Sequence, residues 1–297
     1  MINVNHLTKR FGKFTALEQI TCTIPNGCVY GMVGSNGAGK STFLRILSGI
    51  YKPCEGNVLY DGQPVWENPS VKGKIAFIPD NLFFLGNCTL NRMRSLYSTI
   101  FKNFDNKRFH ELITSFGLNP HTLVSTLSKG MRRQGAIILA LSSRPEYMFF
   151  DETFDGLDPV MRNYVKTLIA EDTVQRGSTA IITSHSLREL EDMCDQLALL
   201  HKGGMALEND VENLKTTQFR VQIAFSRPFD QSDFKDMNII HFSKHGSVAN
   251  VIIRGQKEQT IERLKSMNPE ILDILPLSLE EVFTYEMEAL GYGFKPV

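Results

Sequence analysis

A glycine-rich segment is the part of the sequence whose residue types and spacing point most directly to chemistry. Residues 34–42 read GSNGAGKST and fit the pattern G-x-x-x-x-G-K-[ST]. The apolar run Val29–Val33 precedes the segment and the amphipathic run STFLRILSGI overlaps its end, which predicts a strand, a loop and a helix in succession. Backbone N–H groups in such a loop, together with the helix N-terminus, surround an anion. We therefore predict a phosphate-binding loop.

Each position of this loop suits contact with a polyphosphate. Gly34, Gly37 and Gly39 let the backbone turn tightly, while Lys40 reaches the outer phosphates and the Ser41 hydroxyl can ligate Mg²⁺. The predicted nucleotide contacts also include Ser35, Asn36, Ala38 and Thr42. A glycine-rich turn without a ligand is the alternative, and the strand and helix on either side favour the phosphate site.

Two carboxylates, Asp151 and Glu152, follow the apolar residues YMFF in the segment EYMFFDET. Buried carboxylates are costly unless they serve a metal or a proton transfer. We predict that Asp151 holds Mg²⁺, directly or through water, and that Glu152 is the general base that polarises an attacking water. Such a pair alone is equally typical of a turn, but the upstream phosphate loop favours the functional interpretation.

The order of the motifs resembles that of the ATP-binding cassette ATPases. LSKGM at residues 127–131 stands where that family has its LSGGQ signature, and GLDP at residues 156–159 is similar to its D-loop. IITSH ends at His185, like the switch histidine of the family, and Phe11 stands where the family stacks an aromatic ring on adenine. The resemblance extends from residue 1 to about residue 215.

This resemblance implies the fold, the reaction and the partners. The fold class would be α/β: a P-loop NTPase ABC cassette over residues 1–214, with a mixed sheet core and a helical subdomain at about 81–142. The activity would be ATP hydrolysis with ATP and Mg²⁺, between two cassettes in a head-to-tail homodimer or heterodimer. Ser128 and Gly130 of the signature would grip the γ-phosphate of the partner's ATP. A lone cassette with LSKGM and an appended tail is similar to the ATPase subunits of ABC-2-type exporters.

Three residues depart from the family pattern. Asp80 stands where the family has its Q-loop glutamine, and we predict that it acts catalytically by orienting Mg²⁺ or water. A turn residue in P-D-N is the alternative. In the signature, Lys129 either adds a cation near the partner's nucleotide or points into water, and Met131 removes a polar side chain.

The remaining sequence predicts the elements that position these residues. Short β-branched or apolar runs at 3–7, 20–24 and 28–33 predict strands, and helical periodicity dominates from Thr89 to Leu141. The run SLRELEDMCD predicts a helix with Ser186 and Glu189 as a capping box. After residue 214 alternating strands and two helices predict a smaller C-terminal α/β domain, residues 215–297, whose last helix has Ser278 and Glu281 at capping-box spacing.

Composition and run lengths limit the partners. The 32 basic and 32 acidic side chains cancel, which disfavours direct nucleic-acid binding. The five cysteines are scattered without a C-x-x-C pair, as is typical of a reducing compartment. Apolar runs are too short to span a bilayer, so we expect a cytoplasmic chain. The resemblance implies that this chain lies at the inner face of the membrane and powers a separately encoded permease.

The expected docking region for that permease is the stretch Asn81–Phe104. Its apolar side chains are Leu82, Phe83, Phe84, Leu85, Tyr97, Phe101 and Phe104, for which burial in the core is the alternative. An ATPase acting on a ribosome or nucleic acid is the competing function, but only one cassette is present and no long coiled coil separates the phosphate motifs. Glu152 and His185 disfavour a sensor that does not hydrolyse ATP.

Overall fold

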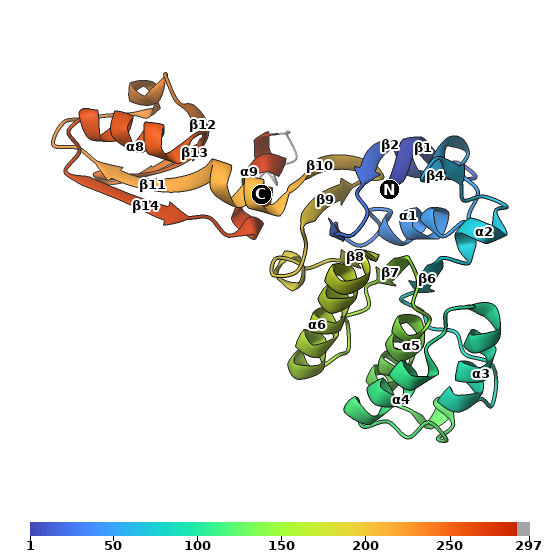
Figure 1. The fold of residues 1–297 in the computed structure, drawn as a ribbon. Helices are drawn as coiled ribbons and strands as arrows, with labels where there is room; N and C mark the ends of the chain where they lie inside the picture. Colours follow the sequence, from blue (N-terminus) through green and yellow to red (C-terminus); the bar gives the residue numbers. More distant parts are fainter. Residues whose placement is uncertain (290–297) are drawn as a thin grey trace. The chain divides into compact units, whose positions relative to one another are not determined.

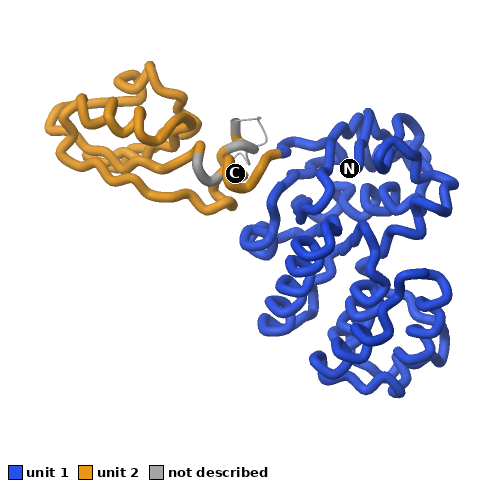
Figure 2. Tube along the Cα trace, in the orientation of Figure 1, with its two compact units in different colours: residues 1–208 blue, residues 209–297 orange. Residues whose placement is uncertain are grey.

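The computed structural model describes residues 1–289. The chain forms two compact units, residues 1–208 and 209–297 (Figure 2). The first unit contains all the motifs predicted to bind nucleotide, and the second corresponds to the C-terminal part of the chain. Within residues 1–289, no helix combines the length and the apolar character needed to cross a bilayer.

A six-stranded sheet forms the centre of the first unit, with the order β10-β9-β3-β8-β7-β6. Its strands are β3 (Val29–Val33), β6 (Ile75–Ile78), β7 (Tyr147–Asp151), β8 (Thr179–Ser184), β9 (Gln196–His201) and β10 (Gly204–Asp210). Every residue of β3, β7 and β8 is buried, as expected for strands covered on both faces. These three strands are parallel neighbours, so their carboxyl ends meet at one edge of the sheet.

A second, antiparallel sheet packs with the helix that follows the phosphate loop. Its order is β2-β1-β4-β5, with β1 (Ile2–Phe11), β2 (Phe14–Ile24), β4 (Glu55–Tyr60) and β5 (Gln63–Pro64). Helix α1 (Lys40–Leu47) contacts both β2 and β7, and its Phe43, Leu44 and Leu47 are fully buried in the shared core. This packing holds the start of α1 in place. The mixed sheets and helices confirm the predicted fold class.

The remaining helices of the first unit lie mostly between the two phosphate motifs. They are α2 (Pro69–Lys72), α3 (Leu90–Ile100), α4 (Asn106–Ser115), the short 3-10 helix η1 (Val124–Thr126), α5 (Lys129–Ser142) and α6 (Pro159–Arg176). Helices α3, α4 and α5 contact one another and form a group beside the sheet (Figure 1). The side chains of Thr89, Asp105 and Ser128 each accept a hydrogen bond from the first turn and fix where these helices begin.

The prediction of a helix after β8 was wrong. Residues Leu187–Glu189 form only a single 3-10 turn, η2, and Ser186 makes no side-chain cap. Glu189 binds elsewhere instead: one carboxylate oxygen accepts a hydrogen bond from the Ser184 hydroxyl at 2.7 Å, and the other lies 2.7 Å from Arg162. Arg162 belongs to α6, so the Glu189 carboxylate is engaged in tertiary contacts. It is therefore not available to cap the backbone at Ser186, as a capping box requires.

The second unit is a four-stranded antiparallel sheet with order β12-β13-β11-β14, with α8 beside it (Figure 1). Its elements are α7 (Val211–Thr217), β11 (Gln218–Ala224), the 3-10 helix η3 (Gln231–Phe234), β12 (Asn238–His245), β13 (Val248–Arg254), α8 (Lys257–Ser266), β14 (Ile271–Pro276) and α9 (Leu279–Ala289). The unit begins six residues before the predicted 214/215 boundary, because α7 packs against α9 and β11. The predicted capping box of α9 is present, since Ser278 and Glu281 bond each other's backbone N–H groups.

Candidate functional site

The loop between β3 and α1 presents an open helix N-terminus. Gly37 and Gly39 have positive φ angles of 80° and 111°, which a residue with a Cβ rarely adopts. Gly39 is the N-cap of α1, and no side chain of the described chain caps that helix. The first N–H groups of α1 are therefore directed at whatever anion enters the loop. Residues 35–37 are exposed at its tip.

The Lys40 ammonium lies at the centre of this loop, with only 5% of the residue exposed. It donates to the backbone oxygens of Gly34 at 2.5 Å and Ser35 at 3.2 Å. It also lies 3.0 Å from Oε1 of Glu152, so the cation and the predicted base form a buried ion pair. A polyphosphate in the loop would offer Lys40 new anionic partners in place of this carboxylate.

Asp151 and Ser41 form the part of the site that suits a divalent cation. Asp151 is fully buried, and its Oδ1 accepts hydrogen bonds from Ser41 at 3.0 Å and Thr183 at 2.9 Å. Burial raises the pKa of Asp151, and the Ser41 and Thr183 hydroxyls oppose that shift. The other oxygen, Oδ2, is buried with no hydrogen-bond partner among the described residues. An orphaned carboxylate oxygen beside a serine hydroxyl fits Mg²⁺, which prefers hard oxygen ligands.

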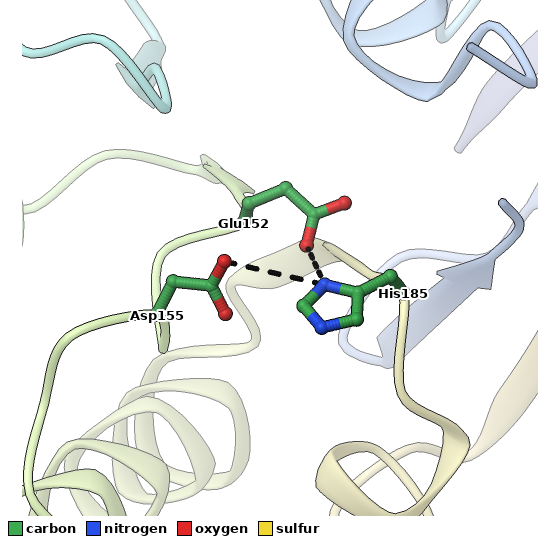
Figure 3. Close-up of side chains that lie close together, drawn as sticks. All are labelled: Glu152, Asp155 and His185. Atoms are coloured by element: carbon green, nitrogen blue, oxygen red, sulfur yellow. Dashed lines mark hydrogen bonds and ion pairs between the residues drawn. The ribbon is translucent and has the colours of Figure 1, made fainter. Parts of the chain in front are cut away.

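Glu152, Asp155 and His185 converge beside this pair (Figure 3). His185 Nδ1 lies 3.1 Å from Glu152 Oε2 and 4.0 Å from Asp155 Oδ2. The hydrogen bond to Glu152 raises the pKa of His185, and the charge of Asp155 raises it further. Glu152 therefore lies between two cationic or protonatable groups, with Lys40 on one oxygen and His185 on the other.

Asp80 has a partner that the sequence did not suggest. Its Oδ1 lies 3.0 Å from Nη2 of Arg133, a guanidinium that is only 1% exposed although it belongs to α5. Arg133 also donates to the backbone oxygens of Glu152 and Asp155 through Nη1. The negative charge of Asp80 is thus balanced by a buried cation of the chain itself. The predicted catalytic action of Asp80 on Mg²⁺ or water stays a prediction.

The signature residues lie at the start of α5. Ser128 is the N-cap, and its hydroxyl oxygen accepts from the N–H of Met131 at 3.2 Å, which leaves the O–H able to donate. A Cβ on Gly130 would stand 2.8 Å from the backbone oxygen of Gly156, so only glycine fits this close approach. Lys129 is exposed, which is compatible with both of its predicted interpretations.

The ring of Phe11, which is predicted to stack on adenine, is partly open to solvent. The residue is 44% exposed, and its ring meets Tyr51 edge-on at 5.6 Å between centroids. Lys9 Nζ lies 5.1 Å from the Phe11 ring centroid, a distance typical of a cation–π contact.

A groove of about 390 Å³ separates the edge of the central sheet from the helical group. It is lined by Ile78, Pro79 and Ala136 and by five of the seven side chains predicted for docking, namely Leu82, Phe83, Phe84, Tyr97 and Phe101. Phe83 is 82% exposed, so it is not buried in the core, which was the alternative to docking. Phe104 instead packs on the ring of Phe109, inside the helical group.

These features define a nucleotide-binding cassette, and comparison with known proteins identifies its family. The model of the ABC transporter family matches residues 17–155. The chain is 29% identical to the ABC transporter ATP-binding protein YtrB of Bacillus subtilis (strain 168) over 283 residues, 95% of this chain and 97% of YtrB. It is 30% identical to the bacitracin transport ATP-binding protein BcrA of Bacillus licheniformis over 218 residues, 72% of this chain and 71% of BcrA.

A solved ATP-binding subunit of an ABC transporter shares the fold, with a TM-score of 0.68 and 24% identity over 72% of this chain and 91% of that one. The chain therefore belongs to the ABC transporter ATP-binding proteins and is an ATPase of that family.

Sequence reasoning missed three residues of this site. Thr183 pairs with Asp151 in the β7–β8 register, and it could have been found as the polar residue two positions before His185. Asp155 lies in the turn between the carboxylate pair Asp151–Glu152 and the D-loop-like GLDP at residues 156–159. Arg133 carried no signal, because an arginine in an amphipathic helix is usually exposed.

Proposed function

We propose that this chain binds and hydrolyses ATP at the carboxyl ends of β3, β7 and β8, as one cassette of a dimer that powers a separate permease of the ABC-2 exporter type. The observation that supports this proposal best is the convergence of Lys40, Asp151, Glu152 and His185 on the phosphate loop. A cation, a metal-ligating carboxylate and a base with its own histidine are the groups that phosphoryl transfer to water requires.

Each group has a distinct task in this proposal. Lys40 and the N–H groups of α1 bind the outer phosphates, and Phe11 stacks on the adenine. Mg²⁺, held by Ser41 and Asp151, would neutralise charge on the phosphate oxygens when it is bound. Glu152 accepts a proton from the attacking water, and His185 orients the Glu152 carboxylate through their hydrogen bond.

Glu152→Gln and Lys40→Ala separate turnover from binding. Glu152→Gln should retain ATP binding but stop phosphate release, because the amide cannot accept the proton while the loop is intact. Lys40→Ala should instead weaken ATP binding, because the buried cation is lost. Glu111→Gln, on the exposed face of α4, is the matched control and should change neither measurement. A wild-type rate of phosphate release in Glu152→Gln would reject Glu152 as the general base. A wild-type ATP affinity in Lys40→Ala would contradict the phosphate site.

Dimerisation should depend on ATP. Ser128 and Gly130 begin α5 in the helical group and are proposed to contact the γ-phosphate bound by the partner cassette. Both halves of the site are present in this chain, which allows a homodimer, and a heterodimer with a related cassette is the alternative. Light scattering of Glu152→Gln with Mg-ATP should detect a dimer. A monomer at saturating ATP and micromolar protein would exclude the homodimer.

The permease is proposed to dock in the groove between the sheet edge and the helical group. The relative BcrA is named for bacitracin transport, which supports an export subunit at the inner face of the membrane. Phe83→Asp should abolish copurification with a coexpressed ABC-2-type permease while leaving basal ATPase activity unchanged. Val174→Asp on α6 is the control, because Val174 is 84% exposed and Phe83 is 82% exposed. Equal loss of copurification in both variants would reject the groove.

A further inference from the structure

Arg133 is a buried guanidinium that joins three segments of the first unit. It belongs to α5, the helix that the signature begins, and only 1% of the residue is exposed. One nitrogen, Nη2, donates to the backbone oxygen of Asp80 at 2.8 Å and to its Oδ1 at 3.0 Å. The other, Nη1, donates to the backbone oxygens of Glu152 and of Asp155, the latter at 2.9 Å.

The turn that Arg133 binds is the one that carries the proposed base. Glu152 and Asp155 both direct their carboxylates at His185 from this turn (Figure 3). Glu152 has a φ of 47°, in the left-handed region that a residue with a Cβ adopts only with backbone strain. Such a conformation persists only where surrounding contacts hold it. Arg133 supplies one of them, directly at the carbonyl of the strained residue.

Asp80 orients the guanidinium from the other side. An arginine buried to this extent needs an opposite charge, because an unpaired buried cation is strongly destabilising. Asp80 supplies that charge, and both of its acceptors bind the same nitrogen, so Nη1 remains directed at the turn after β7. The planar, forked guanidinium can span these two segments, whereas a lysine ammonium presents a single point of charge.

We infer that Arg133 is a positioning residue for ATP hydrolysis: it holds the Glu152 turn in its strained conformation, and Asp80 acts on the reaction through Arg133. This inference rests on the proposed role of Glu152. Arg133 also connects the signature to the base. Ser128 of the signature is the N-cap of α5, and Arg133 lies in the second turn of the same helix. A second contact, between Gly130 and Gly156, packs the same two segments together.

Steady-state ATPase assays test this role through the separation of kcat from KM. Arg133→Ala should lower kcat by about 10- to 100-fold, the loss expected from a small displacement of a reacting group. KM and the dissociation constant for a fluorescent ATP analogue should change less than about twofold, because the phosphate loop is untouched. Asp80→Asn should lower kcat less, since the backbone oxygen and the amide oxygen still accept from Nη2.

Arg108→Ala is the control for a merely structural effect. Arg108 on α4 is also a largely buried arginine, and its Nη2 lies 2.5 Å from Oδ1 of the buried Asp172 on α6. That variant should lower the melting temperature without lowering kcat. Equal losses of kcat in Arg108→Ala and Arg133→Ala would overturn the inference. If Arg133→Ala does not fold, Arg133→Lys carries the test, and a full rate in Arg133→Lys would also overturn it.

The combination with Glu152→Gln shows whether Arg133 acts through Glu152. The double variant Arg133→Ala/Glu152→Gln should retain the residual rate of Glu152→Gln alone, because residues that act as one unit are not additive. A further loss equal to that of Arg133→Ala alone would overturn the inference. A slow Glu152→Gln beside a fast Arg133→Ala rejects only this inference, whereas a fast Glu152→Gln rejects the proposed base itself.

Discussion

Thr183 is the residue whose removal tests the packing of the site most directly. Its hydroxyl is buried between two functional residues: it donates to Asp151 Oδ1 at 2.9 Å and accepts from the Glu152 N–H at 3.1 Å. Thr183→Val keeps the shape and burial of the side chain but removes both hydrogen bonds. The change therefore isolates the polar contribution of one oxygen atom.

The expected loss of stability follows from these two bonds. A hydrogen bond to a charged group contributes about 1.5–3 kcal/mol, and leaving the buried N–H of Glu152 without a partner costs about 1–3 kcal/mol. We therefore expect Thr183→Val to lower the free energy of unfolding by about 2.5–6 kcal/mol. For a unit of this size the melting temperature should fall by roughly 5–24 °C. ATPase activity should fall as well, because Asp151 and Glu152 lose a shared partner.

Two variants make this measurement decisive. Thr183→Ser retains the hydroxyl and should recover most of the stability. Thr173→Val on α6 is the matched control, because Thr173 is 6% exposed and its hydroxyl has no hydrogen-bond partner in the described part of the chain. It should be neutral or stabilising in a thermal melt. The reasoning is refuted if Thr183→Val and Thr173→Val change the melting temperature by the same amount.

Two further predictions concern the signature and the histidine. Gly130→Ala should destabilise the protein by about 1–3 kcal/mol, because its Cβ would meet the Gly156 backbone oxygen at 2.8 Å. Gly86→Ala is the control and should melt near the wild-type temperature, because its Cβ would have no described neighbour within 4 Å. Equal melting temperatures of the two variants would contradict the Gly130–Gly156 contact. The pKa of His185, followed by NMR in nucleotide-free protein, should lie above 6.5 and fall in Glu152→Gln, because Glu152 is the main cause of the shift. Since this pKa is raised by folding, the stabilisation is complete below pH 6.5 and is lost as pH rises through the folded value. A pKa that is the same in both proteins would contradict it.

Local sequence determined the phosphate loop, because its requirements are local. Gly37 and Gly39 supply positive φ angles, Lys40 follows at a fixed spacing, and the apolar residues of β3 and α1 lie immediately beside them. The buried strands β7 and β8 could also be predicted, since unbroken apolar runs need cover on both faces. The structure adds that these strands are parallel neighbours, which brings their terminal residues to one edge of the sheet.

Tertiary structure decided the partners of the charged residues. Arg133 and Asp80 are 53 positions apart, and nothing in either neighbourhood indicates that one is buried against the other. The helix predicted after His185 was lost for the same reason, because Glu189 is engaged by Ser184 and Arg162. Glycine geometry and apolar periodicity act within a few residues and can be read from the chain. A buried charge is stable only beside a specific partner, and folding alone determines which residue that is.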